Sequence, residues 1–369
     1  MIPVNTPLLN GNEKKYLNEC IDSGWISSEG PFVSRFENEF SNYIGKKHGI
    51  AVCNGSAALD VAVKALQLEK GSEVILPTFT IISPAQSIVK QGLVPVLVDS
   101  DIRTWNMDVH KIEQKITSKT KAILVVHIYG LPADMNPVLA LAKKYNLKII
   151  EDAAEMHGQE YRNKKCGSFG DISIFSFYPN KHITTGEGGM ILTDDDHLAS
   201  ECRKFMNLCF LPERRFVHEE IGWNYRMTNM QAALGVAQLE NIDIIVEKKR
   251  EIGKRYAYNL SGIKDLQLPL DKTNYSKNIY WVFGLLAESE NLALKVQKAL
   301  RDKKIGTRPF FWCMHEQPVF SKINLFNNQS HPNAEKMARK GFYIPSGLAL
   351  TNEQIDKVSD VLLNVVGHG

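Results

Sequence analysis

One lysine of the sequence, Lys181, stands where a reactive amine is expected. It lies in the stretch Phe175 to Met190, where a predicted strand ends and a turn rich in aromatic, small and glycine residues follows. Apolar neighbours remove water from the ammonium, so the amine loses its proton more easily and becomes more nucleophilic. A lysine that binds a carbonyl compound as a Schiff base needs this property. Because a lone lysine is usually an exposed surface residue, the hypothesis needs support from other features.

A carboxylate at the end of another predicted strand provides such support. Asp152 directly follows the strand predicted at Lys148 to Glu151. Ligands of open α/β sheets bind at the carboxyl ends of the strands. A carboxylate there could pair with the protonated pyridine nitrogen of a cofactor and keep its ring able to accept electrons. Taken alone, Asp152 could equally cap a helix.

A turn suited to phosphate binding lies further upstream. Asn54-Gly55-Ser56 follows a predicted strand and precedes the helix predicted at Ala57 to Leu66. Free backbone N–H groups and the helix dipole favour a phosphate at such a position. An ordinary turn capped by Asn54 or Ser56 explains the same residues equally well.

The elements that must position these residues alternate along the chain. Short β-rich runs and segments of helical period, such as Met135 to Tyr145, follow one another between about residues 48 and 195, which predicts an α/β fold with a mostly parallel seven-stranded sheet. The expected strands are Gly49 to Cys53, Glu73 to Leu76, Val94 to Val98, Ala122 to Val126, Lys148 to Glu151, Ile172 to Phe177 and Gly189 to Thr193.

The remainder of the chain predicts an N-terminal arm and a smaller C-terminal domain. Helices are expected at Asn12 to Ser23, at Val33 to Tyr43 and, capped by Thr228, as one helix from Thr228 to Tyr258. Because the length exceeds that of a usual single core, we expect a large domain with the arm over residues 1–240 and a small α+β domain over 241–369. The predicted elements of the small domain are a strand at Ile279 to Leu286 and helices at Leu292 to Lys303 and Asn352 to Val365.

The phosphate turn, the strand-end aspartate and the shielded lysine occur in the order seen in type I pyridoxal-phosphate enzymes, and the chain resembles the DegT/DnrJ/EryC1/StrS sugar aminotransferases. The resemblance covers nearly the whole length, which makes chance agreement improbable. It rests on Ser23 to Ser27, Asn54 to Ser56, Pro77 to Thr80, Glu151 to Glu155, the lysine stretch, and Asn224 to Thr228.

This resemblance implies the type I fold and pyridoxal 5'-phosphate as cofactor. Lys181 would hold the cofactor as a Schiff base and, once released, would move the proton between cofactor and substrate carbons. Asp152 would bind the ring nitrogen. The phosphate would be held by Ser56, Ala57 and Ser176, and by Asn224 from the neighbouring subunit of a homodimer. By themselves, Ser176 and Asn224 are ordinary strand and loop residues.

Two positions depart from the common pattern of the family. Ile81 stands where many members have an aromatic residue that stacks on the pyridine ring, so ring packing must be aliphatic or come from elsewhere. Glu155 stands where many members have glutamine. Near the phenolic oxygen of the cofactor, its carboxylate must share a proton with that oxygen or form a hydrogen bond through a proton. Related sugar dehydratases replace the lysine by histidine, so Lys181 favours transamination, and His182 and His157 are interpreted as structural neighbours.

Substrate contacts are predicted at three residues. Arg226 and Arg308 would complement a diphosphate. Arg308 and His315 belong to a segment that resembles the one that closes over the sugar nucleotide in some members of the family. A basic surface turn with core aromatic residues explains this segment equally well.

The expected reaction is transfer of an amino group from L-glutamate to the 4-keto carbon of a nucleotide-linked 4-keto-6-deoxy sugar. Two alternatives remain: a smaller phosphorylated ketone as acceptor, and a protein that binds the cofactor without turnover. The motifs do not determine the nucleotide, the sugar or the carbon that receives the amine.

Composition excludes other classes of function. The 44 basic and 41 acidic residues give a net charge of +3 without a dense basic block, which argues against nucleic-acid binding. The six cysteines have no paired spacing, so we expect reduced thiols and neither a disulfide framework nor a metal site. No signal peptide or membrane span is recognised, and a cytoplasmic enzyme is expected.

Overall fold

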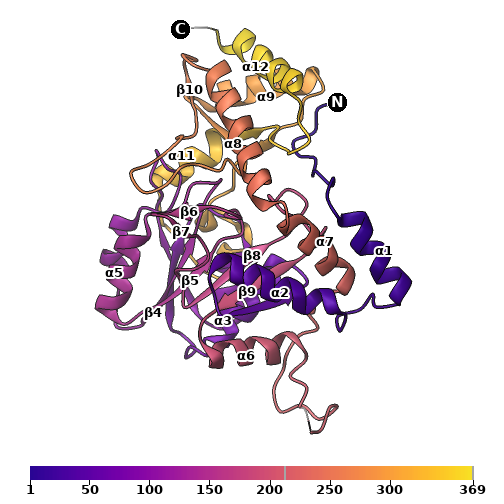
Figure 1. Ribbon diagram of the computed structural model, residues 1–369. Coiled ribbons are helices and arrows are strands. Elements are labelled where there is room, and N and C mark those ends of the chain that lie inside the picture. Colours follow the sequence, from indigo (N-terminus) through magenta and orange to yellow (C-terminus); the bar gives the residue numbers. More distant parts are fainter. Residues whose placement is uncertain (212, 368–369) are drawn as a thin grey trace.

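A seven-stranded sheet forms the centre of the protein in the computed structural model, which describes residues 1–211 and 213–367 (Figure 1). The strand order is β1-β9-β8-β5-β4-β2-β3. The strands are His48–Val52 (β1), Glu73–Pro77 (β2), Val94–Val98 (β3), Thr120–Val126 (β4), Lys148–Asp152 (β5), Ile172–Ser176 (β8) and Gly189–Thr193 (β9). Each predicted strand is present to within two residues, which confirms the α/β prediction.

Six of the seven strands run in the same direction. The pairs β2–β3, β2–β4, β4–β5 and β5–β8 are parallel, whereas β9 is antiparallel to both β1 and β8. The carboxyl ends of the six strands therefore meet at one edge of the sheet. Asp152 is the last residue of β5 and lies at this edge.

Helices cover both faces of the sheet, because successive strand residues point to opposite sides. Ile50 and Val52 pack in one apolar core, and Ala51 between them packs in the other. The first core contains residues of the helices Gly55–Ala65 (α3), Ser83–Lys90 (α4) and Asp196–Met206 (α6). The second contains residues of Glu13–Ser23 (α1), Pro31–Ile44 (α2), Met135–Tyr145 (α5) and Asn229–Leu239 (α7).

The prediction of one helix from Thr228 to Tyr258 is wrong. Thr228 and Gln231 form the expected capping box, but α7 ends at Leu239 and a separate helix, Ile242–Asn259 (α8), follows. Asn241 between them has φ −112°, outside the helical range. The carboxylate of Glu240 at the break accepts hydrogen bonds from Asn12 and Tyr16 of the N-terminal arm. These bonds connect α1 with the end of α7.

A second, four-stranded sheet lies in the C-terminal region, which is residues 242–367. Its strand order is β10-β11-β13-β12, with bounds Leu266–Gln267, Phe283–Ala287, Gly341–Ile344 and Arg308–Pro309 respectively. The expected strand Ile279 to Leu286 begins only at Phe283, because Tyr280 has φ +50° and cannot be extended. Around the sheet lie α8 and the helices Glu290–Asp302 (α9), Pro318–Ser321 (α10), Pro332–Lys340 (α11) and Asn352–Val366 (α12). The division into domains at residue 240 stays a prediction.

The N-terminal segment extends across to the C-terminal region (Figure 1). Ile2 pairs with Ile305, and the N–H of Ser346 donates to the carbonyl of Val4. The remaining short elements are Glu160–Tyr161 (β6), Lys164–Lys165 (β7), and the 3₁₀ turns Val109–Lys111, Glu113–Lys115 and Met314–Glu316. Within the described ranges, no helix has both the length and the apolar character needed to cross a membrane.

Candidate active site

A cavity of about 580 Å³ opens at the carboxyl ends of the parallel strands and is closed on its far side by the C-terminal region. It brings together residues that are up to 289 positions apart, from Asn54 to Tyr343. The predicted site residues that line it are Ser56, Asp152, Glu155, Ser176, Lys181 and Arg308. Six of the predicted contacts therefore converge on one space.

Lys181 is the ammonium group at the centre of this cavity. Only 10% of its side chain is exposed, and its Nζ lies 3.8 Å from Glu155 Oε1 and 4.1 Å from the ring centroid of Trp281. Burial lowers the pKa of Lys181, and the charges of Glu155 and Asp152 oppose this shift. The amine thus combines partial shielding from water with anionic neighbours, as the sequence predicts for a reactive lysine.

The two carboxyl groups beside Lys181 are both buried, but they are held differently. Asp152 Oδ1 accepts one hydrogen bond, from the N–H of Ala154 at 3.1 Å, and burial raises the pKa of Asp152 to about 6. Glu155 Oε2 accepts from the N–H of Tyr129 at 2.7 Å, and burial raises its pKa further, against the influence of Lys181. Asp152 keeps one oxygen without a hydrogen bond within the described chain.

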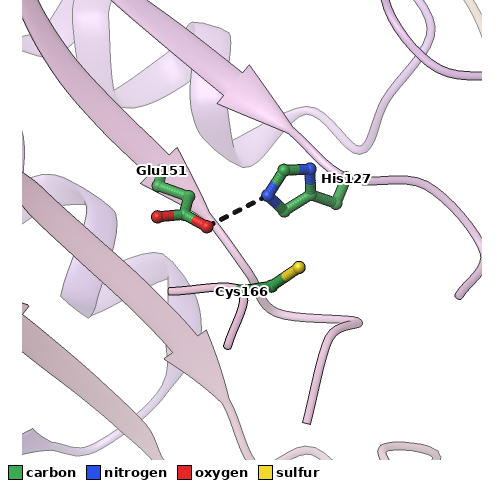
Figure 2. Close-up of side chains that lie close together, drawn as sticks. All are labelled: His127, Glu151 and Cys166. Carbon is green, nitrogen blue, oxygen red and sulfur yellow. Dashed lines mark hydrogen bonds and ion pairs between the residues drawn. The ribbon is translucent and has the colours of Figure 1, made fainter. Parts of the chain in front are cut away.

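A polar cluster behind Asp152 fixes the strand that carries it (Figure 2). Glu151 is fully buried and accepts from His127 Nε2 at 3.1 Å and from the N–H of Phe169 at 2.8 Å. Further donors to it are the N–H groups of Gly167 and Gly170 and the hydroxyl of Ser173. Burial alone would raise the pKa of Glu151, but these donors outweigh it and lower the pKa. Glu151 is therefore a fixed anion.

His127, Glu151 and Cys166 lie close enough to suggest a metal site, but their hydrogen bonds argue against one. His127 Nδ1 accepts from the N–H of Ala133 at 3.1 Å, so the ring proton is on Nε2, which points at Glu151 (Figure 2). A protonated nitrogen has no lone pair for a metal ion. Burial also raises the pKa of the Cys166 thiol, which disfavours the thiolate that a metal would need.

The predicted phosphate end of the cavity is formed by the start of α3. The N–H groups of Gly55 and Ser56 lie in the first helical turn, where the helix itself provides no acceptor. Ser56 Oγ lies 2.7 Å from Ser83 Oγ. A Cβ on Gly55 would lie 2.7 Å from Ser176 Cβ, so only glycine allows this close approach of turn and strand. The N–H of Ala57, in contrast, donates to Asn54 Oδ1, and Ala57 does not line the cavity.

Besides Ala57, three predicted residues do not reach the cavity within this chain: Asn224, Arg226 and His315. Asn224 is exposed, and its Oδ1 accepts two hydrogen bonds from Arg226. Neither residue lines the cavity. His315 is buried between Thr78, at 2.8 Å, and Glu335, at 3.2 Å, and also lies outside the lining.

His157 and His182 are structural neighbours, as expected. Both are buried, and burial lowers the pKa of each, to about 3 for His157, so neither carries a charge near neutral pH. His157 packs against Phe175 and Phe177, and His182 Nε2 lies 3.3 Å from the carbonyl oxygen of Ile279.

Among the lining residues that sequence reasoning did not select are His127, Trp281 and Tyr343. His127 directly follows β4, so the strand-end rule that selected Asp152 could also have found it. Tyr343 is in β13 of the C-terminal sheet, and Trp281 lies just before β11. No local sequence signal connects either residue with Lys181. Ile81 lines the cavity and is half exposed, while the aromatic side chains of the lining are Tyr178, Trp281, Phe311 and Tyr343.

Comparisons with known proteins agree with this geometry. The profile of the DegT/DnrJ/EryC1/StrS aminotransferase family matches residues 7–363. The chain is 44% identical over 357 residues to GDP-perosamine synthase of Escherichia coli O157:H7, covering 96% of this chain and 95% of that protein. It is 38% identical over 369 residues to GDP-perosamine synthase of Vibrio cholerae, covering 99% of each. In structure it resembles the Helicobacter pylori aminotransferase PseC, with a TM-score of 0.93, 24% identity and 99% of each chain covered.

Proposed function

Since this chain belongs to the DegT/DnrJ/EryC1/StrS aminotransferase family, we propose that it transfers an amino group from L-glutamate to the 4-keto carbon of a nucleotide-linked 4-keto-6-deoxy sugar. The protein is a pyridoxal-phosphate-dependent aminotransferase of the nucleotide-sugar class. The observation that carries the proposal is the convergence of Lys181, Asp152 and Glu155 in one cavity at the strand ends.

The side chains of the cavity fit pyridoxal phosphate. Lys181 provides a shielded amine, and the free oxygen of the buried Asp152 suits a protonated ring nitrogen. The first turn of α3 and Ser176 meet at a close approach that suits a phosphate. When bound, the cofactor supplies the carbonyl group that carries nitrogen from one substrate to the other and a ring that withdraws electrons.

The roles of the chain's own residues follow from their charges. Asp152, as an anion, would keep a proton on the ring nitrogen of the cofactor. Lys181 Nζ, with its pKa lowered by burial, would move a proton between the substrate carbon and the cofactor carbon. Glu155 lies 3.8 Å from Lys181 Nζ and can share a proton with an oxygen next to it. The apolar and aromatic lining excludes water from these transfers.

For the acceptor we propose a GDP-linked sugar, because relatives matched over nearly their whole length are named GDP-perosamine synthase. Arg308 of this chain and the partner subunit's Arg226 would meet the diphosphate, since guanidinium groups bind phosphate oxygens in pairs. His315 would act indirectly, by holding Thr78 beside the cavity. Relatives of this kind do not favour the two alternatives, a smaller phosphorylated ketone and a protein without turnover.

The homodimer is also part of the proposal. Asn224 is exposed and lies outside its own cavity, as expected of a residue that serves the partner's site. The six free thiols fit a reducing compartment, which supports the cytoplasm as the place of reaction.

Subunit complementation tests the shared site. Lys181→Ala protein and Asn224→Ala protein should each be inactive or weak, and they are mixed under conditions that exchange subunits. Half of the dimers are then hybrids with one intact site of two, so activity should return to about a quarter of native. If Asn224 acts within its own chain, no hybrid has an intact site and mixing restores nothing.

Turnover tests the reaction itself. The holoenzyme is incubated with L-glutamate and a GDP-linked 4-keto-6-deoxyhexose, and the product is identified by mass and NMR. We expect 2-oxoglutarate and a 4-amino sugar in equal amounts over many turnovers. Amination of a small phosphorylated ketone at a higher kcat/KM would replace the proposed acceptor.

A further inference from the structure

A second, smaller cavity adjoins the active site. It has a volume of about 280 Å³ and is closed on one side by the N-terminal segment Pro3–Asn5. We call this cavity the side chamber. The residues that line both it and the main cavity are Tyr178, Asn180, Trp281, Arg308 and Tyr343. The two spaces therefore share one wall next to Lys181.

Arg308 is the cation of the side chamber. It lies on β12 and pairs with Tyr343 of β13. Among the described residues, no carboxylate pairs with its guanidinium and no side-chain hydrogen bond engages it. Lys181 is the other ammonium or guanidinium group in the linings of the two cavities. Burial raises the pKa of Tyr343 to about 12, and the charge of Arg308, its partner in the strand pair, acts against this rise.

A second unused polar group lies on the shared wall. Asn180 directly precedes Lys181, and its side-chain Oδ1 is buried without a hydrogen bond in the described chain. Its backbone is held, because the carbonyl accepts from Trp281 Nε1 at 2.9 Å. The opposite wall is held as well, since Asn5 Nδ2 donates to the carbonyl of Pro179 at 2.8 Å. The amide of Asn180 can thus offer N–H or oxygen to a ligand between firmly placed walls.

We infer that the side chamber receives the distal carboxylate of the amino donor and that Arg308 is its counter-ion. This inference rests on the proposed function, in which the two substrates occupy the site in turn. One guanidinium can then serve the donor in one half-reaction and the phosphate of the acceptor in the other. A small, partly enclosed space suits the short side chain of a dicarboxylic amino acid, whereas a nucleoside diphosphate needs the larger, more open cavity.

Comparison of L-glutamate with L-alanine isolates this contact. Both donors carry the same amine and the same α-carboxylate, and they differ in the side chain that would enter the side chamber. A hydrogen-bonded contact between a carboxylate and a guanidinium corresponds to roughly a 10- to 100-fold difference in binding. The native protein should therefore prefer L-glutamate, and loss of the Arg308 charge should remove the preference.

The experiment follows the absorbance change of the cofactor-loaded protein after each donor is added, without any sugar nucleotide. In Arg308→Ala, the ratio of L-glutamate to L-alanine rate constants should fall by roughly 10- to 100-fold. Arg308→Lys, which keeps the charge, should recover part of the ratio. Arg103→Ala, which removes an arginine from a different surface cavity, is the matched control and should keep the native ratio.

Ligand binding gives a readout that does not depend on turnover. Calorimetry with glutarate and butyrate compares a dicarboxylate with a monocarboxylate on native and Arg308→Ala holoenzyme. We expect weaker glutarate binding in the variant and unchanged butyrate binding. A retained glutamate preference, or equal losses for both ligands, would overturn the inference. Absence of any Lys181-dependent absorbance band would instead refute the proposed function, so the two failures are distinguishable.

Discussion

The two walls of the cavity differ in how the chain builds them. The sheet wall consists of Ser56, Asp152, Glu155, Ser176 and Lys181, and each of these residues ends a strand or follows one closely. The C-terminal wall consists of Trp281, Arg308, Phe311 and Tyr343, which come from a short edge strand, its neighbour and irregular segments.

This difference separates chemistry from specificity. Parallel strands bring their carboxyl ends to one edge of the sheet independently of the other elements. The positions of the residues that we propose bind the cofactor can therefore be predicted. The C-terminal wall depends on how a second sheet and the N-terminal segment pack against the first. Substitutions in the C-terminal wall can therefore change which substrate is bound without changing the residues of the sheet wall.

The largest effect should come from removing the charge at the centre of the sheet wall. Asp152→Asn keeps the shape of the side chain but would lack the charge that we propose holds a proton on the ring nitrogen of the cofactor. We expect the rate of the L-glutamate half-reaction to fall on the order of 10³-fold, comparable with the loss of a preorganised charge in other active sites. Stopped-flow absorbance measures the rate, with the exposed Asp22→Asn as control. A loss of less than tenfold would contradict the assigned role.

Glu155 makes the sheet wall sensitive to pH. Burial raises its pKa to about 8, against about 4.3 in an unfolded chain. The folded protein then binds more protons between about pH 4 and 8, so its stability should fall as pH rises across this window. The side chain in Glu155→Gln cannot titrate, so the free energy of unfolding should decrease less steeply with pH, by at most about 1.4 kcal/mol per pH unit. Urea unfolding of the cofactor-free protein at pH 5.5 and 7.5 measures this, and an unchanged pH dependence would count against it.

Lys249 gives the C-terminal side the opposite dependence. It is buried on α8, donates to the carbonyls of Trp281 and Ser346, and has its pKa lowered by burial to about 7. The unfolded chain, with a lysine pKa of about 10.4, binds more protons between about pH 7 and 10, so stability should rise with pH there.

Lys249→Met should therefore flatten this rise, again by at most about 1.4 kcal/mol per pH unit. Lys254→Met, on the same helix but with 62% of its side chain exposed, is the matched control and should keep the native dependence. Urea unfolding at pH 7 and 9 compares the three proteins. A native-like rise in Lys249→Met would show that the buried ammonium is not its source.

What the sequence could predict follows the same division. Asp152 and Lys181 were found because strand ends and shielding are local properties. Arg308 and His315 are seven residues apart in one segment, yet only Arg308 faces the cavity, because an irregular segment has no period that fixes side-chain direction. The resemblance implies that Ala57 holds the phosphate, but its N–H already donates to Asn54, the cap residue of α3.

The most direct test of the account is the visible absorbance spectrum of the protein with pyridoxal phosphate, before and after L-glutamate, in native protein and Lys181→Ala. We expect the native protein to show a cofactor band that L-glutamate converts and 2-oxoglutarate restores, and the variant to show neither change at a native rate. The same band and the same conversion in Lys181→Ala would contradict the central role of this lysine.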